Sequence, residues 1–208
     1  MAQQIENLKH TVAELLANIQ MLLEKQSNEK ARAASKKFIP TSERIYGVRV
    51  PEINKLAQLF KSGGFELLEA LWLSGAFEER LLAAKLLGKI GKQNPDKTLY
   101  LARFFSVDIV DWAVCDTLAT QGLRSIHKIK QKEIFALARE LIQSTNLWQR
   151  RFALVMLEPY TADKKLHHDI YALIDIVKND KEYYIKKAIQ WLQRNMNEHQ
   201  VHKRNTKT

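Results

Sequence analysis

The chain has 208 residues, 46% of them hydrophobic and 27% charged, which is ordinary globular composition with enough length for a sizeable core in one domain. Its 33 Lys and Arg exceed its 23 Asp and Glu and give a formal net charge of +10. Acids and bases balance within residues 1–35, so the basic surface belongs to the main body. This charge favours polyanionic partners, and nucleic acid is the leading candidate.

Several classes of protein are excluded by what the sequence does not contain. The single cysteine, Cys115, rules out an intrachain disulfide. No apolar run approaches the roughly 20 residues of a membrane span, and no secretory signal pattern opens the chain. We therefore expect a protein of the reducing cytoplasm, associated with the nucleoid when it is bound to DNA.

Apolar residues recur at three-and-four spacing along the whole chain, as in amphipathic helices. Turn residues or prolines bound each segment, and Asn94 before Pro95 is a predicted helix N-cap. No alternating pattern typical of strands occurs. The sequence therefore predicts an all-α protein with helices at about 5–23, 28–38, 51–61, 65–72, 77–90, 97–105, 108–119, 126–143, 146–157, 163–178 and 182–197.

The helices come in successive pairs of roughly 35 to 40 residues, the repeat length of a superhelical solenoid of antiparallel HEAT- or armadillo-like helix pairs. A compact irregular bundle is the alternative, because periodicity within helices does not specify how they stack. In a solenoid the second helices would line a concave surface suited to an extended partner. We expect one α-helical repeat domain over residues 1–198, with 1–27 as an N-terminal capping helix and 199–208 as a basic tail.

The most informative stretch runs from Asp111 to Asp116. On a helix, Trp112 and Asp116 would project only about 40° apart, whereas Asp111 would lie about 140° from Asp116 and act as a helix-surface or supporting carboxylate. A buried carboxylate costs several kcal/mol unless it is paired or hydrogen-bonded. We therefore expect Asp116 to pair with Arg151, with the pair held between Trp112 and Trp191.

Other kinds of catalytic site find little support. One cysteine and six histidines without ligand spacing make a poor metal set, and phosphate-loop and nucleophile-elbow motifs are absent. We expect neither a metal nor a cofactor. Cys115 is expected to be a small buried hydrophobe, and Trp72 and Trp148 are expected to pack in the core.

Four separated motifs, in this order, resemble the AlkD-type DNA alkylation repair glycosylases over about residues 30–198: Tyr46-Gly47-Val48-Arg49-Val50-Pro51, Trp112-x-x-x-Asp116, Asn146-Leu147-Trp148-Gln149-Arg150-Arg151 and Lys187-Ala188-Ile189-Gln190-Trp191. The resemblance implies a HEAT-like repeat fold with a concave basic DNA-binding face. It also implies release of cationic N3- or N7-alkylated purines from duplex DNA, without flipping the base into a pocket.

The resemblance assigns roles to individual residues. Asp116 would be the catalytic carboxylate, Trp112 and Trp191 the aromatic walls against the deoxyribose and backbone of the lesion, and Arg151 a cation on the DNA backbone. Further DNA contacts are expected from basic residues near Trp191 and after the central helix, namely Arg150, Lys186, Lys187, Arg194, Lys128 and Lys130. The run that holds the last two is equally well explained as a solvated face.

The expected partner is therefore duplex DNA with alkylated bases, bound by a monomer. Two alternatives remain open. Relatives that have lost the catalytic set bind DNA without excising bases, so the chain could be a non-catalytic nucleic-acid-binding module. A protein-interaction scaffold would account for the fold but leave the charge unexplained.

Overall fold

The computed structural model describes residues 2–42 and 44–205, and within them the side chains of residues 12–42 and 44–198. Throughout this part of the chain all regular secondary structure is helical, which confirms the predicted all-α class. The α-helices are α1 (Ala2–Lys25), α2 (Glu29–Phe38), α3 (Val50–Leu59), α4 (Gly64–Ser74), α5 (Phe77–Ile90), α6 (Pro95–Phe105), α7 (Trp112–Thr117), α8 (Gln131–Leu141), α9 (Leu147–Val155), α10 (His167–Val177) and α11 (Tyr183–Asn205).

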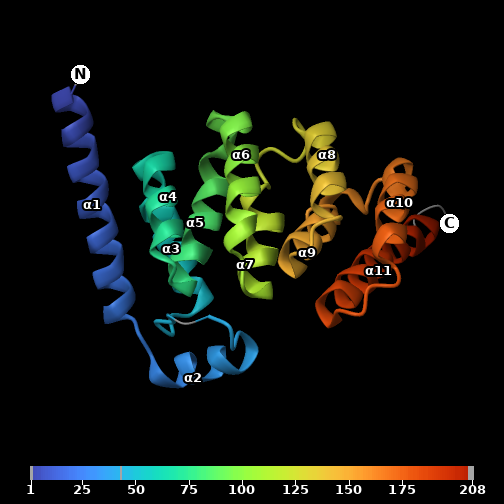
Figure 1. Ribbon diagram of the computed structural model, residues 1–208, viewed down its shortest axis with the longest axis horizontal. Helices are drawn as coiled ribbons and strands as arrows, with labels where there is room; N and C mark the ends of the chain where they lie inside the picture. Colours follow the sequence, from blue (N-terminus) through green and yellow to red (C-terminus); the bar gives the residue numbers. More distant parts are fainter. Residues whose placement is uncertain (1, 43, 206–208) are drawn as a thin grey trace.

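The helices stack in a row from α1 at one end to α11 at the other (Figure 1). Helices α3, α5, α7, α9 and α11 contact one another in succession and form one layer. Within the pairs, α4 packs on α5, α8 on α9 and α10 on α11, while α1 packs on α4. The predicted solenoid is thereby confirmed over the irregular bundle, and the second helices of the pairs form a continuous layer.

Side-chain caps explain where several helices begin. The side chains of Asn28, Asn94, Asp111 and Asn146 each accept a hydrogen bond from a backbone N–H in the first turn of the following helix. The N-cap predicted at Asn94 is confirmed. At the other end of α4, Gly75 has a φ of 83°, the left-handed conformation that commonly ends a helix.

Two predicted helices begin too early. The helix expected from residue 108 begins only at Trp112, because Asp111 has an extended backbone and caps the helix with its own carboxylate. The helix expected from residue 126 begins only at Gln131, because the preceding residues form hydrogen-bonded turns. Between these points α7 continues as a π-helical segment at Leu118–Gly122 that packs closely against Gly88 of α5.

The last helix extends further than predicted. The backbone of α11 continues to Asn205, so residues 199–205 of the predicted basic tail are helical. Their side chains and residues 206–208 lie outside the described part of the structure.

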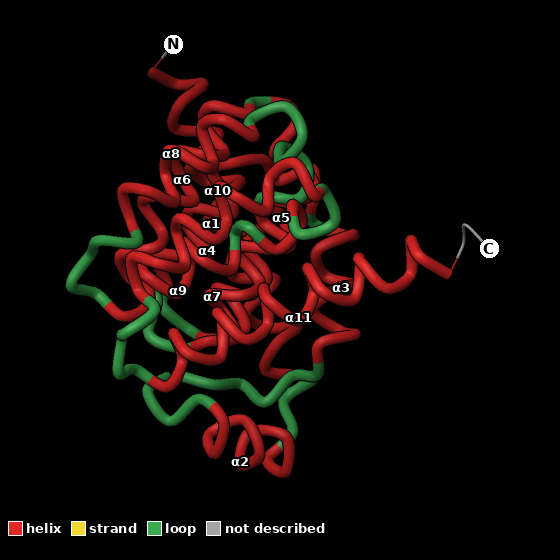
Figure 2. The backbone as a smooth tube through the Cα atoms, turned by 90° about the vertical axis from the view of Figure 1, so that its right-hand side faces the viewer, coloured by secondary structure: helices red, strands yellow, loops and turns green. Residues whose placement is uncertain are grey.

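Helix α2 lies apart from the two layers, across one edge of the stack, in both views (Figures 1 and 2). None of its ten residues is buried. The loop after it is anchored by the buried Glu78 of α5, whose carboxylate accepts hydrogen bonds from the backbone N–H groups of Tyr46, Gly47 and Val48 at 2.7–3.0 Å. Gly47 has a φ of 83° and leaves no room for a Cβ against the backbone of Asn28, so this turn requires glycine.

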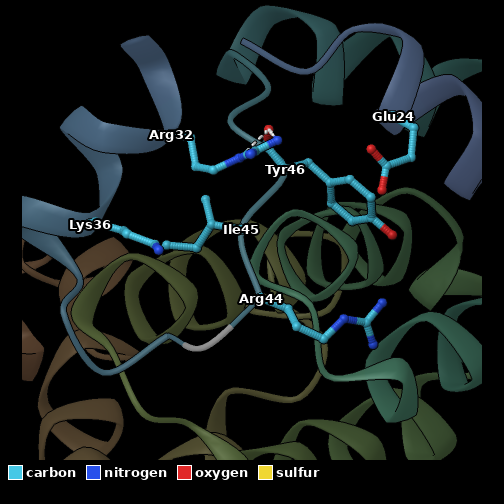
Figure 3. Close-up of a pocket in the computed structure, with 6 residues that line it drawn as sticks. All are labelled: Glu24, Arg32, Lys36, Arg44, Ile45 and Tyr46. Carbon is cyan, nitrogen blue, oxygen red and sulfur yellow. Dashed lines mark hydrogen bonds between the residues drawn. The ribbon is translucent and has the colours of Figure 1, made fainter. Parts of the chain in front are cut away.

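A basic cavity of about 390 Å³ lies between α1, α2 and this loop (Figure 3). Arg32 points into it, but its guanidinium donates hydrogen bonds to the Tyr46 carbonyl, to Ser27 and to Glu29. Arg32 thus attaches α2 to the loop, and its charge is paired with that of Glu29.

Candidate active site

A largely buried ion pair joins α7, which carries Asp116, to α9, which carries Arg151. Arg151 on α9 donates from Nε to Asp116 Oδ1 at 2.9 Å and from Nη2 to Asp116 Oδ2 at 2.8 Å. Its Nη1 donates to the backbone carbonyl of Tyr184 on α11 at 2.6 Å. The side chains of Arg151 and Asp116 are only 7% and 21% exposed. The predicted pairing of Asp116 with Arg151 is confirmed, and the arginine also reaches the third helix.

The environment of Asp116 disfavours its charged form despite this partner. Burial raises the pKa of the Asp116 carboxyl above its ordinary value, and the hydrogen bonds and charge of Arg151 oppose the rise only in part. A largely buried carboxylate interacts more strongly with a positive charge that develops beside it than an exposed one does, because burial weakens screening by solvent. The arrangement can therefore stabilise a cationic intermediate.

The raised pKa predicts how stability depends on pH. Between the unfolded and the folded pKa of Asp116, the folded protein holds a proton that the unfolded chain has released, so the free energy of unfolding falls as pH rises through this window. Asp116→Asn removes the titration. The difference in unfolding free energy, wild type minus variant, should therefore decrease with rising pH across the acidic range, as measured by urea denaturation. A difference that increases with pH would mean that Arg151 lowers the pKa of Asp116.

The two tryptophans predicted to flank the pair differ in exposure, and a tyrosine contacts the pair directly. Trp112 is the first residue of α7 and is 36% exposed, and its indole N–H donates to the Phe38 carbonyl at 3.0 Å. Trp191 on α11 is partly buried against the core. The ring centroid of Tyr184 lies 5.8 Å from the guanidinium carbon of Arg151. Tyr184 is thus the aromatic contact of the pair that sequence reasoning missed, although it precedes Trp191 by two helical turns and shares its face.

The predicted role of Asp111 is half right. This carboxylate is only 2% exposed, so it is not on the helix surface. It accepts a hydrogen bond from the Val114 N–H at 2.8 Å and another from the Ser42 hydroxyl at 3.0 Å, and it supports the start of α7. Burial raises the pKa of Asp111, while these hydrogen bonds act in the opposite direction.

Three of the predicted DNA contacts are engaged within the protein. Arg151 donates to Asp116 and to the Tyr184 carbonyl, so its nearly buried guanidinium is hydrogen-bonded within the protein. Arg150 pairs with Asp180 at 2.9 Å and also donates to two backbone carbonyls. Lys130 contacts two carboxylates, those of Asp96 at 2.7 Å and Glu133 at 3.0 Å.

The other predicted contacts are available to a partner. Lys128, Lys186 and Lys187 are exposed, and Lys187 lies 5.5 Å from the ring centroid of Tyr183. Arg194 is also exposed, with its Nε 3.8 Å from the Glu198 carboxylate. Three of these four residues lie on α11, the helix that carries Tyr184 and Trp191.

The remaining chemistry-bearing groups are accounted for by packing. Cys115 is fully buried, and this burial raises the pKa of its thiol well above the ordinary value. Trp72 is fully buried and stacks on Phe105 with ring centroids 4.3 Å apart, and Trp148 packs on the core beside Tyr184. Among the described side chains, no three His, Cys, Asp or Glu converge as a metal site would require.

None of the helices in the described part of the chain is both long and apolar enough to cross a membrane.

Comparison with known proteins places this geometry in a family. The chain is similar in structure to a predicted DNA alkylation repair enzyme from Enterococcus faecalis, with a TM-score of 0.71 and 17% identity over 85% of each chain. It also aligns with the smu.31 protein of Streptococcus mutans, at 21% identity over 95% of this chain and 90% of the other, with a TM-score of 0.48. No curated protein matches the sequence. The model of the DNA alkylation repair enzyme family matches residues 19–205, and the chain therefore belongs to this family.

Proposed function

We propose that the protein is a DNA glycosylase that releases cationic N3- and N7-alkylated purines from duplex DNA by hydrolysing the N-glycosidic bond. The observation that carries this proposal is the Asp116 carboxylate, which is partly exposed, held by Arg151 and placed one helical turn from the exposed Trp112. Membership of the DNA alkylation repair enzyme family supports the choice of substrate.

The chemistry suits these groups. An alkylated purine already carries positive charge, so the bond between the purine nitrogen and C1′ can break with its electron pair going to the base, without a general acid. The base leaves neutral, and the sugar becomes an oxocarbenium ion. Asp116 would stabilise this cation electrostatically or orient the water that adds to C1′ and then releases a proton.

The two tryptophans would bind beside the reacting sugar. The electron-rich faces of Trp112 and Trp191 favour positive charge nearby and offer apolar contact to the deoxyribose and backbone. Arg151 would hold the carboxylate in place through its two hydrogen bonds, and exposed cations such as Lys186 and Lys187 would contact phosphates.

The experiment that tests the proposal measures release of free 7-methylguanine and 3-methyladenine from methylated duplex DNA by the purified wild-type protein. We expect release in proportion to enzyme and time, above spontaneous depurination in protein-free DNA. Absence of both bases above that background, with DNA binding intact, would overturn the proposal.

A specific observation also favours a second candidate, a non-catalytic DNA-binding module. Each oxygen of Asp116 accepts one hydrogen bond from Arg151, so the carboxylate already has a partner in the free protein. In a glycosylase this arrangement would fix the position of the negative charge of Asp116 before the substrate binds. For a binding module it would be a structural ion pair, and the base-release experiment separates the two.

Binding to DNA should depend steeply on salt under either candidate, because Lys and Arg displace condensed counterions from the phosphates. We expect the logarithm of the binding constant to fall linearly with the logarithm of salt concentration, and Lys187→Ala to reduce the slope by about one. Lys178→Ala, which removes an exposed lysine at the end of α10, is the matched control and should leave the slope unchanged. A flat salt response in the wild type would contradict a phosphate-binding surface.

Trp191→Ala should lower base excision more than nonspecific DNA binding. The reason is that the ring is proposed to contact the reacting nucleotide and not the phosphates along the rest of the duplex. Single-turnover excision and binding to unmodified duplex measure the two effects. Tyr100→Ala removes another aromatic ring, 63% exposed on α6, and serves as the control for truncation of an aromatic side chain. Equal losses of excision and binding in Trp191→Ala would make Trp191 a general contact.

A further inference from the structure

We infer that Ser42 and Asp111 are positioning residues for the proposed glycosylase site, because they clamp the segment after α2 onto the start of α7 and thereby fix Trp112. The inference rests on the proposed function for its catalytic consequence. Its structural part is independent of that function. The hydrogen bonds of Ser42 and Asp111 are made with each other and with the first turn of α7.

Three hydrogen bonds join residues 38–42 to residues 110–112. The Trp112 indole N–H donates to the Phe38 carbonyl at 3.0 Å, and the Thr41 hydroxyl donates to the Val110 carbonyl. The Ser42 hydroxyl donates to Asp111 Oδ2 at 3.0 Å. The two segments are about 70 residues apart in the sequence, so this contact is a tertiary one that the fold has to build.

Asp111 connects the clamp to the helix that carries the site. One of its oxygens accepts from Ser42, and the other accepts from the Val114 N–H and caps α7. Its side chain therefore fixes the first turn of α7 relative to the segment after α2. Trp112 is the first residue of that turn, and Asp116 follows one turn later.

Packing alone does not fix this contact. Helix α2 has no buried residue, and Ile39, directly after it, is the apolar anchor of the segment at 2% exposure. The clamp also borders a polar cavity of about 330 Å³, which is lined by Ser42, Asp111 and the side chain of Arg80. Because Trp112 is 36% exposed, its orientation depends on the hydrogen bond to Phe38 and on the start of α7.

The orientation of Trp112 matters for catalysis and much less for binding. A catalytic group displaced by a fraction of an ångström loses rate while the substrate still binds through its phosphates. Loss of the Ser42 hydroxyl removes one hydrogen bond to Asp111 and lets the start of α7 shift relative to the segment after α2. A small displacement of Trp112 should then cost roughly tenfold in rate. The buried Asp111 would keep its cap but lose its tie to the segment after α2.

The test compares Ser42→Ala, Ser42→Thr and Ser74→Ala with the wild type. In Ser42→Ala we expect kcat for base release to fall about tenfold through misplacement of Trp112, with KM and affinity for unmodified DNA unchanged. Ser42→Thr retains the hydroxyl and should restore kcat. Ser74→Ala removes a hydroxyl at the border of the same cavity that donates only within α4, and it should leave kcat unchanged.

A second readout needs no activity. Amide hydrogen exchange over residues 110–118 should be faster in Ser42→Ala than in the wild type and be restored in Ser42→Thr, with exchange in α4 and α5 unchanged. Unchanged exchange over residues 110–118 would overturn the clamp, and faster exchange throughout the chain would show a merely structural role. If the wild type releases no base, the proposed function fails, and the exchange result alone decides whether the clamp exists.

Discussion

Asp116→Asn should reduce base release by about 10²- to 10³-fold, the loss expected when a group that stabilises transition-state charge is removed. Asparagine has nearly the same shape and keeps one oxygen for Arg151, but it has no negative charge to offer an oxocarbenium ion. Binding to unmodified duplex should remain, because the proposed phosphate contacts are exposed lysines and not this carboxylate. Single-turnover release of 7-methylguanine, with enzyme in excess, measures the effect on chemistry directly.

The control is Asp175→Asn, which makes the same change of charge and size at an exposed carboxylate on α10. It should retain wild-type release, so a loss confined to Asp116→Asn is not an effect of net charge. Both variants should unfold cooperatively at neutral pH. Release at the wild-type rate by a folded Asp116→Asn protein would remove Asp116 from the mechanism.

The fold could be predicted because helical periodicity is a local signal. Segments such as Phe77–Ile90 carry their apolar faces and their boundaries in the sequence itself, and α5 has those same bounds in the structure. The number of residues in each helix pair then favoured a solenoid, because helices joined by short connections pack as neighbours in space. The pairing of Asp116 with Arg151 was predictable for a different reason, because a carboxylate among apolar residues needs a partner.

Features that depend on distant parts of the chain could not be predicted. Asp111 looked like part of a longer helix because Ile109 and Val110 continue the apolar pattern upstream. Its capping role and its contact with Ser42 appear only in the folded structure. Glu78 likewise looks like an ordinary acid in a first helical turn, yet it is fully buried under a loop from about 30 residues upstream.

The contacts of the basic residues could not be predicted either, because their partners are distant in the sequence. Arg150 and Lys130 belong to clusters that look suited to phosphate binding, but their carboxylate partners Asp180 and Asp96 lie 30 and 34 residues away in the sequence. Sequence reasoning counts charges and cannot see which of them are already paired. Of the predicted phosphate contacts, those that remain exposed are Lys128 and, on α11, Lys186, Lys187 and Arg194.

Arg151→Ala should destabilise the protein by about 3–5 kcal/mol, the usual cost of leaving a buried charge without its partner. It removes both hydrogen bonds to Asp116 and the bond to the Tyr184 carbonyl, which ties α9 to α11. Urea denaturation at neutral pH measures the change. Arg103→Ala is the matched control, because it breaks an exposed ion pair with Glu140 and should cost no more than about 1 kcal/mol.

The raised pKa of Asp116 adds a pH dependence to the effect of Arg151→Ala. It means that Arg151 only partly offsets the desolvation of the carboxylate. Below that pKa Asp116 is neutral, so the destabilisation by Arg151→Ala should shrink as pH falls. The double variant Asp116→Leu with Arg151→Met replaces the pair by apolar side chains and should be close to wild type in stability, or above it, while releasing no base. A double variant as unstable as Arg151→Ala would show that the pair holds α7, α9 and α11 together, and stability alone would then explain its presence.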